Sequence, residues 1–147
     1  LGGVPLALEP IAALFDWPDD EYDEADFLTA VLDRTGAMLL LDVANVYANA
    51  RNREQDPVAL LDRLPLDRVA YVHVAGGREH EGLYHDTHTD AVPPEVLDLV
   101  TALAERATPA GWLLERDGDY PPAEVLRTEI GSIAAAVAAG ARTTGVR

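Results

Sequence analysis

The sequence of 147 residues contains no cysteine and no lysine. The absence of cysteine excludes disulfides, thiolate nucleophiles, cysteine-ligated zinc and iron–sulfur clusters. The absence of lysine excludes Schiff-base chemistry, an anchor for pyridoxal phosphate and a Walker P-loop. The chain begins at Leu1 and its only methionine is Met38, so we expect a fragment or a processed product.

Positive charge is also scarce, since 11 arginines face 26 carboxylates and the formal net charge is −15. A field of this sign repels phosphate backbones, so we expect no nucleic-acid partner. Seven carboxylates lie within residues 16–26. We favour a solvated loop leading into a helix N-terminus there over a docking surface for a cationic partner. No run of 18 apolar residues and no signal peptide is present, which predicts no membrane association and a cytoplasmic location.

Short apolar runs alternate with helical patterns four times along the chain. Near-continuous apolar strands joined by helices are typical of a buried parallel α/β sheet. The Ala-rich end, 134–141, is expected to pack closely on that sheet. The predicted strands are 4–8, 38–41, 69–72 and 112–114. The predicted helices are 24–35 (N-cap Asp23, C-terminal Gly36), one from Pro57 with Asp56 as N-cap, 94–107 and 122–139. A polar connection is predicted over 45–52 and a long loop over 75–92.

Each apolar run is followed at once by a residue that can bind a metal or move a proton. Glu9 follows the first run, Asp42 the second, His73 the third and Glu115 the fourth. Because α/β barrels carry their active sites at the C-terminal ends of the strands, we expect these four side chains to converge.

The four histidines all lie within residues 73–88. In the sequence H-D-T-H (85–88), Asp86 and His88 are two residues apart and would point to the same side of an extended segment. We interpret His73, Asp86 and His88 as metal ligands, and His80 and His85 as exposed loop residues. Imidazole and carboxylate ligands suit iron, manganese or zinc, and the negative charge of the set favours two or more ions.

These motifs together resemble the multinuclear non-haem iron-dependent oxidative enzymes (MNIO, MbnB-like). They run in the family's order from Glu9 to Asp117. Departures from the family pattern are Pro10 and Ala44, each in place of asparagine, and Gly77 in place of histidine. The matching stretches are L-A-L-E (6–9), F-D-W-P-D-D-E (15–21), L-L-L-D-V-A-N-V-Y-A-N-A-R-N (39–52), L-P-L-D-R-V-A-Y-V-H-V-A-G (64–76), H-D-T-H (85–88) and L-L-E-R-D (113–117).

The resemblance implies an α/β fold, a TIM-type (βα)8 barrel, of which this chain covers roughly the last four βα units. It would be a single partial domain, 1–147, lacking the N-terminal half-barrel. The family also implies two or three iron ions and O2-dependent oxidation of side chains, cysteine above all, in a ribosomally made peptide. A peptide substrate and a small peptide-presenting protein are the implied partners. The implied metal ligands are Glu9, Asp42 (a ligand or a residue that orients one), Asn45, His73, Asp86, His88 and Glu115, and the implied catalytic proton acceptor is Asp117.

Two other interpretations stay open. A divalent-metal TIM-barrel isomerase or endonuclease-like enzyme gathers the same residue types, although the acidity opposes a nuclease and the absence of lysine opposes a lysine-dependent sugar site. A degenerate half-barrel acting as a binding module would hold metal weakly or not at all. Because unpaired edge strands promote aggregation, we expect the 147-residue chain alone to form a homodimer or to behave poorly in solution.

Overall fold

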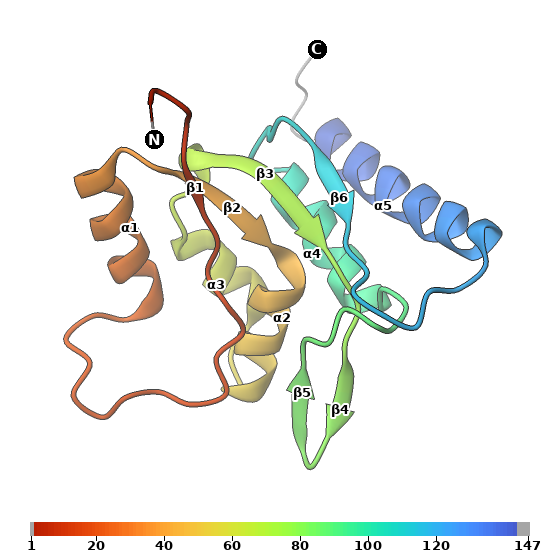
Figure 1. The fold of residues 1–147 in the computed structure, drawn as a ribbon, viewed down its shortest axis with the longest axis horizontal. Helices are drawn as coiled ribbons and strands as arrows, with labels where there is room; N and C mark the ends of the chain where they lie inside the picture. The colour runs from red at the N-terminus through yellow and green to blue at the C-terminus, as the bar shows by residue number, and fades with distance from the viewer. Residues whose placement is uncertain (1, 144–147) are drawn as a thin grey trace.

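The computed structural model describes residues 2–143, and its centre is a four-stranded parallel sheet (Figure 1). In the register, Asp42 lies opposite His73 and Val74 opposite Leu114, so the C-terminal ends of the strands share one edge of the sheet. The strands lie side by side in the order β1 (Ala7–Leu8), β2 (Met38–Asp42), β3 (Val69–Val74) and β6 (Trp112–Leu114).

Helical segments connect successive strands of the sheet. α1 (Glu24–Thr35) joins β1 to β2, α4 (Pro94–Ala104) precedes β6, and α5 (Ala123–Thr143) follows it. Between β2 and β3 lie α2 (Val43–Asn52), α3 (Pro57–Arg63) and the 3-10 helix η1 (Leu66–Arg68). This order of elements is a mixed α/β fold with a parallel sheet, compatible with part of a TIM-like fold.

The predicted first helix is confirmed at both ends. The Asp23 side chain accepts a hydrogen bond from the Asp26 amide at 3.1 Å, which caps the N-terminus. Gly36 ends the helix with a left-handed backbone (φ 70°), a conformation that glycine adopts without steric cost. Arg63 forms an ion pair with Asp23, and Arg53 with Asp16. The acidic stretch is therefore an exposed, partly paired loop that leads into a helix.

The two faces of the sheet differ in burial. Leu39, Leu41 and Val72 point to one face and have no exposed surface, because the helices cover them. Tyr71 and Leu113 point to the other face and are 38% and 45% exposed. The accessible surface of 8624 Å² exceeds the roughly 7,300 Å² expected for a compact monomer of this mass. One sheet face thus stays open, as it would in an isolated section of a barrel wall.

The predicted polar connection at 45–52 is wrong, because this segment is helix α2. Asp42 caps the helix by accepting a hydrogen bond from the Ala44 amide at 2.7 Å. The asparagines that suggested a loop use their amides in tertiary contacts. Asn45 donates to the Pro10 carbonyl at 3.1 Å, and Asn52 exchanges two hydrogen bonds with the Tyr84 backbone. Polar residues at helical spacing therefore mark a helix whose amides make tertiary contacts.

The predicted long loop at 75–92 contains a hairpin, formed by β4 (Arg78–His80) and β5 (Leu83–His85). The strands are joined by Glu81 and Gly82, with φ of 51° and 81°, the positive values of a type I′ hairpin turn. Strands of three residues carry no readable alternation, which is why the sequence pattern did not reveal them. The hairpin projects beyond the C-terminal end of β3 (Figure 1).

The last helix differs from its prediction in length and in what it packs against. α5 runs to Thr143, and its Ala-rich part lies against α4 more than against the sheet. A Cβ atom at Gly140 would lie 2.2 Å from the Thr101 carbonyl oxygen, so glycine permits the close approach of the two helices. No helix within residues 2–143 combines the length and the apolar character needed to cross a membrane.

Substitutions at two glycines of α5 test this packing, because we expect them to change the free energy of unfolding in opposite directions. Gly140→Ala should lower the free energy of unfolding by about 1–3 kcal/mol, because the new methyl group meets α4 backbone. Gly131→Ala is the control, since its Cβ would meet nothing within 4 Å and should raise stability by about 0.5–1 kcal/mol. Urea unfolding followed by circular dichroism measures both. Stabilisation by both substitutions would contradict the described contact between α4 and α5.

Candidate metal centre

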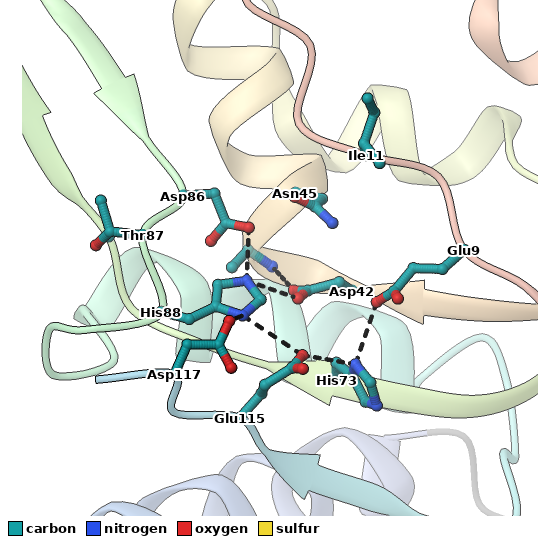
Figure 2. Close-up of polar contacts among 12 residues, drawn as sticks. Glu9, Ile11, Asp42, Asn45, His73, Asp86, Thr87, His88, Glu115 and Asp117 are labelled. Atoms are coloured by element: carbon teal, nitrogen blue, oxygen red, sulfur yellow. Dashed lines mark hydrogen bonds and ion pairs between the residues drawn. The ribbon is translucent and has the colours of Figure 1, made fainter. Parts of the chain in front are cut away.

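The four residues predicted at the strand ends converge at one edge of the sheet (Figure 2). His73 Nδ1 lies 3.1 Å from Glu9 Oε1 and 2.7 Å from Glu115 Oε2. Asp42 is fully buried and lies opposite His73 in the sheet register. His73 is predicted to follow the third strand, but β3 extends to Val74 and His73 lies inside it. The expected convergence is confirmed.

A second set of contacts surrounds His88, which comes from the segment after the hairpin (Figure 2). Its Nε2 lies 2.6 Å from Asp86 Oδ2 and 3.3 Å from Asp42 Oδ2. Its Nδ1 lies 3.5 Å from both Glu115 Oε2 and Asp117 Oδ2. The expected extended backbone is wrong at His88, whose φ is 53°, yet the side chains of Asp86 and His88 do meet.

The candidate ligands form three overlapping groups. Within each group the potential ligand atoms lie within 4.8 Å of one another. Asp42, His88 and Glu115 each belong to two groups, and a carboxylate with two oxygens can contact two ions at once. The overlap distinguishes this arrangement from an isolated surface cluster of acids. The groups are Glu9, Asp42, His73 and Glu115; Asp42, Asp86 and His88; and His88, Glu115 and Asp117.

The side chains present fit a metal ion. Buried atoms of four of them make no hydrogen bond to any residue in the described part of the chain: Asp42 Oδ2, His73 Nδ1, Asp86 Oδ1 and His88 Nδ1. Buried polar atoms are normally hydrogen-bonded, yet three of these atoms face charged groups of the cluster without hydrogen-bond geometry, an arrangement that a cation between them would satisfy. Carboxylate oxygens and imidazole nitrogens are ligands for iron, manganese or zinc.

The ionisation of the cluster reflects its crowding and burial. Burial raises the pKa of Glu9 above its usual value, although the adjacent His73 opposes the shift. Burial also raises the pKa of Asp86, against the hydrogen bond from His88. The Asp42 and Asp86 carboxylates beside Nε2 raise the pKa of His88 to about 10. In the metal-free protein a proton on His88 thus balances part of the negative charge, a role that a bound cation would replace.

An open cavity of about 320 Å³ gives access to this cluster. Asp117 stands at its rim with a side chain 67% exposed, whereas Asp42 and His73 lie beneath. The predicted ligand Asn45 also faces the cavity, with its Nδ2 held by the Pro10 carbonyl. Residues 10–12 form one wall, and six predicted site residues line the rest: Glu9, Asn45, Asp86, His88, Glu115 and Asp117.

Two residues that support the site were not anticipated. Asn49, 1% exposed, accepts a hydrogen bond from the Ala13 amide at 2.8 Å and donates to the Ile11 carbonyl at 3.2 Å, which fixes the wall of the cavity. Arg116 bonds the Thr89 carbonyl at 2.7 Å beside His88. The spacing of four from Asn45 to Asn49 indicates one helix face and could have revealed Asn49. Arg116 lies within the motif L-L-E-R-D, but nothing in that motif indicates that its side chain bonds Thr89 and Glu129.

His80 and His85, predicted as exposed loop residues, lie in the two strands of the hairpin with ring centroids 5.8 Å apart; His80 is exposed and His85 is half-buried. Gly77, where the family pattern has histidine, lies against this hairpin. A Cβ atom there would lie 2.2 Å from the His85 carbonyl oxygen, so this backbone path has no room for a side chain.

Asp42→Asn tests the candidate centre without disturbing the fold. An asparagine still caps α2 but removes one negative charge from the cluster, so the metal-free protein should keep its far-UV circular dichroism spectrum. Metal affinity should fall by about tenfold or more, because Asp42 belongs to two ligand groups. Asp56→Asn changes the N-cap of α3, outside the site, and is the control. Metal titration decides the question: equal affinity of Asp42→Asn and the wild-type protein would remove Asp42 from the centre.

Comparison with known proteins agrees with this geometry. A family model described as the RiPP precursor modification enzyme MbnB/TglH/ChrH matches residues 2–138, RiPP denoting a ribosomally made and modified peptide. A UPF0276 protein of Streptomyces avermitilis is 52% identical over 130 residues, covering 88% of this chain and 27% of that protein. A UPF0276 protein of Caulobacter vibrioides is 39% identical over 138 residues, covering 94% of this chain and 49% of that protein.

The UPF0276 protein of Chromobacterium violaceum is 38% identical over 127 residues, which cover 86% of this chain and 46% of that protein. The chain thus spans half or less of the length of these relatives. Since the family model covers nearly all of the sequence, including each of the ligand-bearing motifs, the chain belongs to the MbnB/TglH/ChrH family of RiPP precursor modification enzymes.

Proposed function

We propose that this chain carries much of the metal centre of a non-haem iron-dependent enzyme that uses O2 to oxidise side chains, cysteine above all, of a ribosomally made peptide. One observation carries the proposal: three groups of potential ligands overlap at Asp42, His88 and Glu115 on one edge of the sheet. Such sharing favours two or three ions over one. A hard oxygen and nitrogen ligand set without thiolate favours iron, with manganese or zinc as alternatives.

The ligands divide between neighbouring ions according to the groups. Glu9, His73 and Glu115, with Asp42, would hold one ion. Asp86 and His88 would hold a second ion, again with Asp42. A third ion would lie between His88 and Glu115, on the side that faces Asp117. Asn45 would add its amide oxygen from the cavity wall, since its nitrogen already bonds Pro10.

The protein's own groups have separate tasks around such a centre. Iron, when bound, supplies reactivity toward O2. The cavity would admit one substrate side chain, and Ile11 and Ala12 would give that side chain an apolar contact. Asp117, exposed at the rim, is placed to accept a proton from the arriving side chain. In the metal-free protein, Asp86 is hydrogen-bonded to His88 at 2.6 Å and holds the imidazole in place.

We also propose that the chain forms roughly the last four βα units of a (βα)8 barrel. The open sheet face with Tyr71 and Leu113 would then line the barrel interior. Chain outside residues 1–147 would supply the other strands and further ligands, and a small partner protein would present the peptide. The coverage of only 46–49% of the Caulobacter and Chromobacterium relatives supports this arrangement.

Metal counting and oxygen uptake in the full-length protein test the proposal. Purified without oxygen and loaded with Fe(II), it should bind two or three iron atoms per chain. It should consume O2 with a cysteine-containing peptide encoded beside it, and not with the Cys→Ser form of that peptide. His73→Ala should lose at least one iron, whereas His80→Ala, on the exposed hairpin, should lose none.

Other results would contradict the proposal in distinct ways. Fewer than one metal ion per chain would exclude a multinuclear centre and favour a degenerate binding module. Turnover of a sugar or of abasic-site DNA with Mn(II) or Zn(II), independent of O2, would favour an isomerase or an endonuclease-like enzyme.

A further inference from the structure

Arg116 lies between two residues of the candidate site, yet its side chain points away into the protein. Its exposed fraction is 7%, and that of its partner Glu129 on α5 is 10%. The Arg116 Nη2 donates to both Glu129 carboxylate oxygens, at 2.8 and 2.6 Å. The Nη1 donates to the Thr89 carbonyl at 2.7 Å. One guanidinium thus joins the segment after β6, the segment that carries His88, and helix α5.

The Arg116 side chain completes a set of links between the two ligand-bearing segments. The Glu115 amide donates to the Val74 carbonyl at 3.0 Å, which continues the sheet by one residue. The Asp117 amide donates to the His88 carbonyl at 2.9 Å. Between these two backbone bonds, Arg116 is the side chain that ties residues 115–117 to Thr89. The spacing between His88 and Glu115 depends on these links.

The Arg116–Glu129 pair is better suited to orientation than to stability. A buried ion pair costs about as much in desolvation as it returns, so replacing both partners by apolar residues is often neutral for folding, whereas removing one partner leaves a buried charge. The buried Arg116 Nε also makes no hydrogen bond within residues 2–143, a further cost. What the pair provides is geometry, because a planar guanidinium fixes its several donors in one fork that lysine cannot reproduce.

We propose that Arg116 is a positioning residue, held by Glu129, that sets the placement of Glu115 and Asp117 relative to His88. The metal-binding consequence rests on the proposed function, whereas the placement itself does not. Glu129 acts indirectly: its carboxylate, on α5, neutralises and orients the Arg116 guanidinium.

The experiment compares Arg116→Met, Arg116→Lys and Glu129→Gln with Arg106→Met in the full-length protein. Arg106 is a matched control because it too binds a carboxylate, Asp62, and a backbone carbonyl, that of Ala102, but lies away from the site. The rate of amide hydrogen exchange is measured in the metal-free protein for residues 86–90 and 113–119. Exchange should accelerate about tenfold or more in Arg116→Met and Glu129→Gln, less in Arg116→Lys, and remain unchanged in Arg106→Met.

Iron affinity, measured by competition with a chelator, is the second readout. It should fall about 10–100-fold in Arg116→Met, as is typical when a residue that orients metal ligands is lost, and less in Arg116→Lys. If Arg116→Met does not fold, Glu129→Gln and Arg116→Lys carry the comparison. Exchange and affinity equal to those of Arg106→Met would overturn the proposal. Faster local exchange in a protein that binds no iron even as wild type would contradict the proposed function and support the positioning role.

Discussion

Five carboxylates crowd around two histidines at the C-terminal edge of the parallel sheet, and the surrounding segments must hold these charged groups close together. Parallel strands place their C-terminal ends at one edge, so the residues at or just after the ends of β1, β2, β3 and β6 lie close together. Burial raises the pKa values of Glu9 and Asp86. The neighbouring carboxylates of Asp42 and Asp86 raise the pKa of His88, because they stabilise its positive charge. Bound cations would supply positive charge directly.

The surrounding structure holds in place the loops that carry these charges. Ligands on strands are fixed by the sheet, but His88 and the cavity wall lie on irregular segments. Asn49 fixes the wall through two backbone groups, and Arg116 fixes the segment beside His88. The Asn52 amide clamps the hairpin through the Tyr84 backbone. Buried side-chain contacts to backbone thus supply the rigidity that irregular segments lack, which a precisely spaced ligand set requires.

Much of this arrangement was predictable because it depends on local pattern. Caps such as Asp23 and Asp56 mark helix starts, and apolar runs followed by Asp42 or Glu115 mark strands that end at the candidate site. Two of the three features that were not predictable depend on contacts distant in sequence, and the third on strands too short to show a pattern. Helix α2 was hidden because its asparagines bond residues some 35 positions away. The hairpin was hidden because its strands are three residues long, and Arg116 because its partner Glu129 lies beyond a turn, on another element.

Anomalous diffraction at the iron edge from crystals of the iron-loaded full-length protein is the most direct test of a shared multinuclear centre. The account predicts at least two anomalous peaks at the edge of the sheet, each within bonding distance of residues from the overlapping groups, with Asp42, His88 or Glu115 common to neighbouring peaks. A single peak, or peaks remote from His73 and His88, would contradict it.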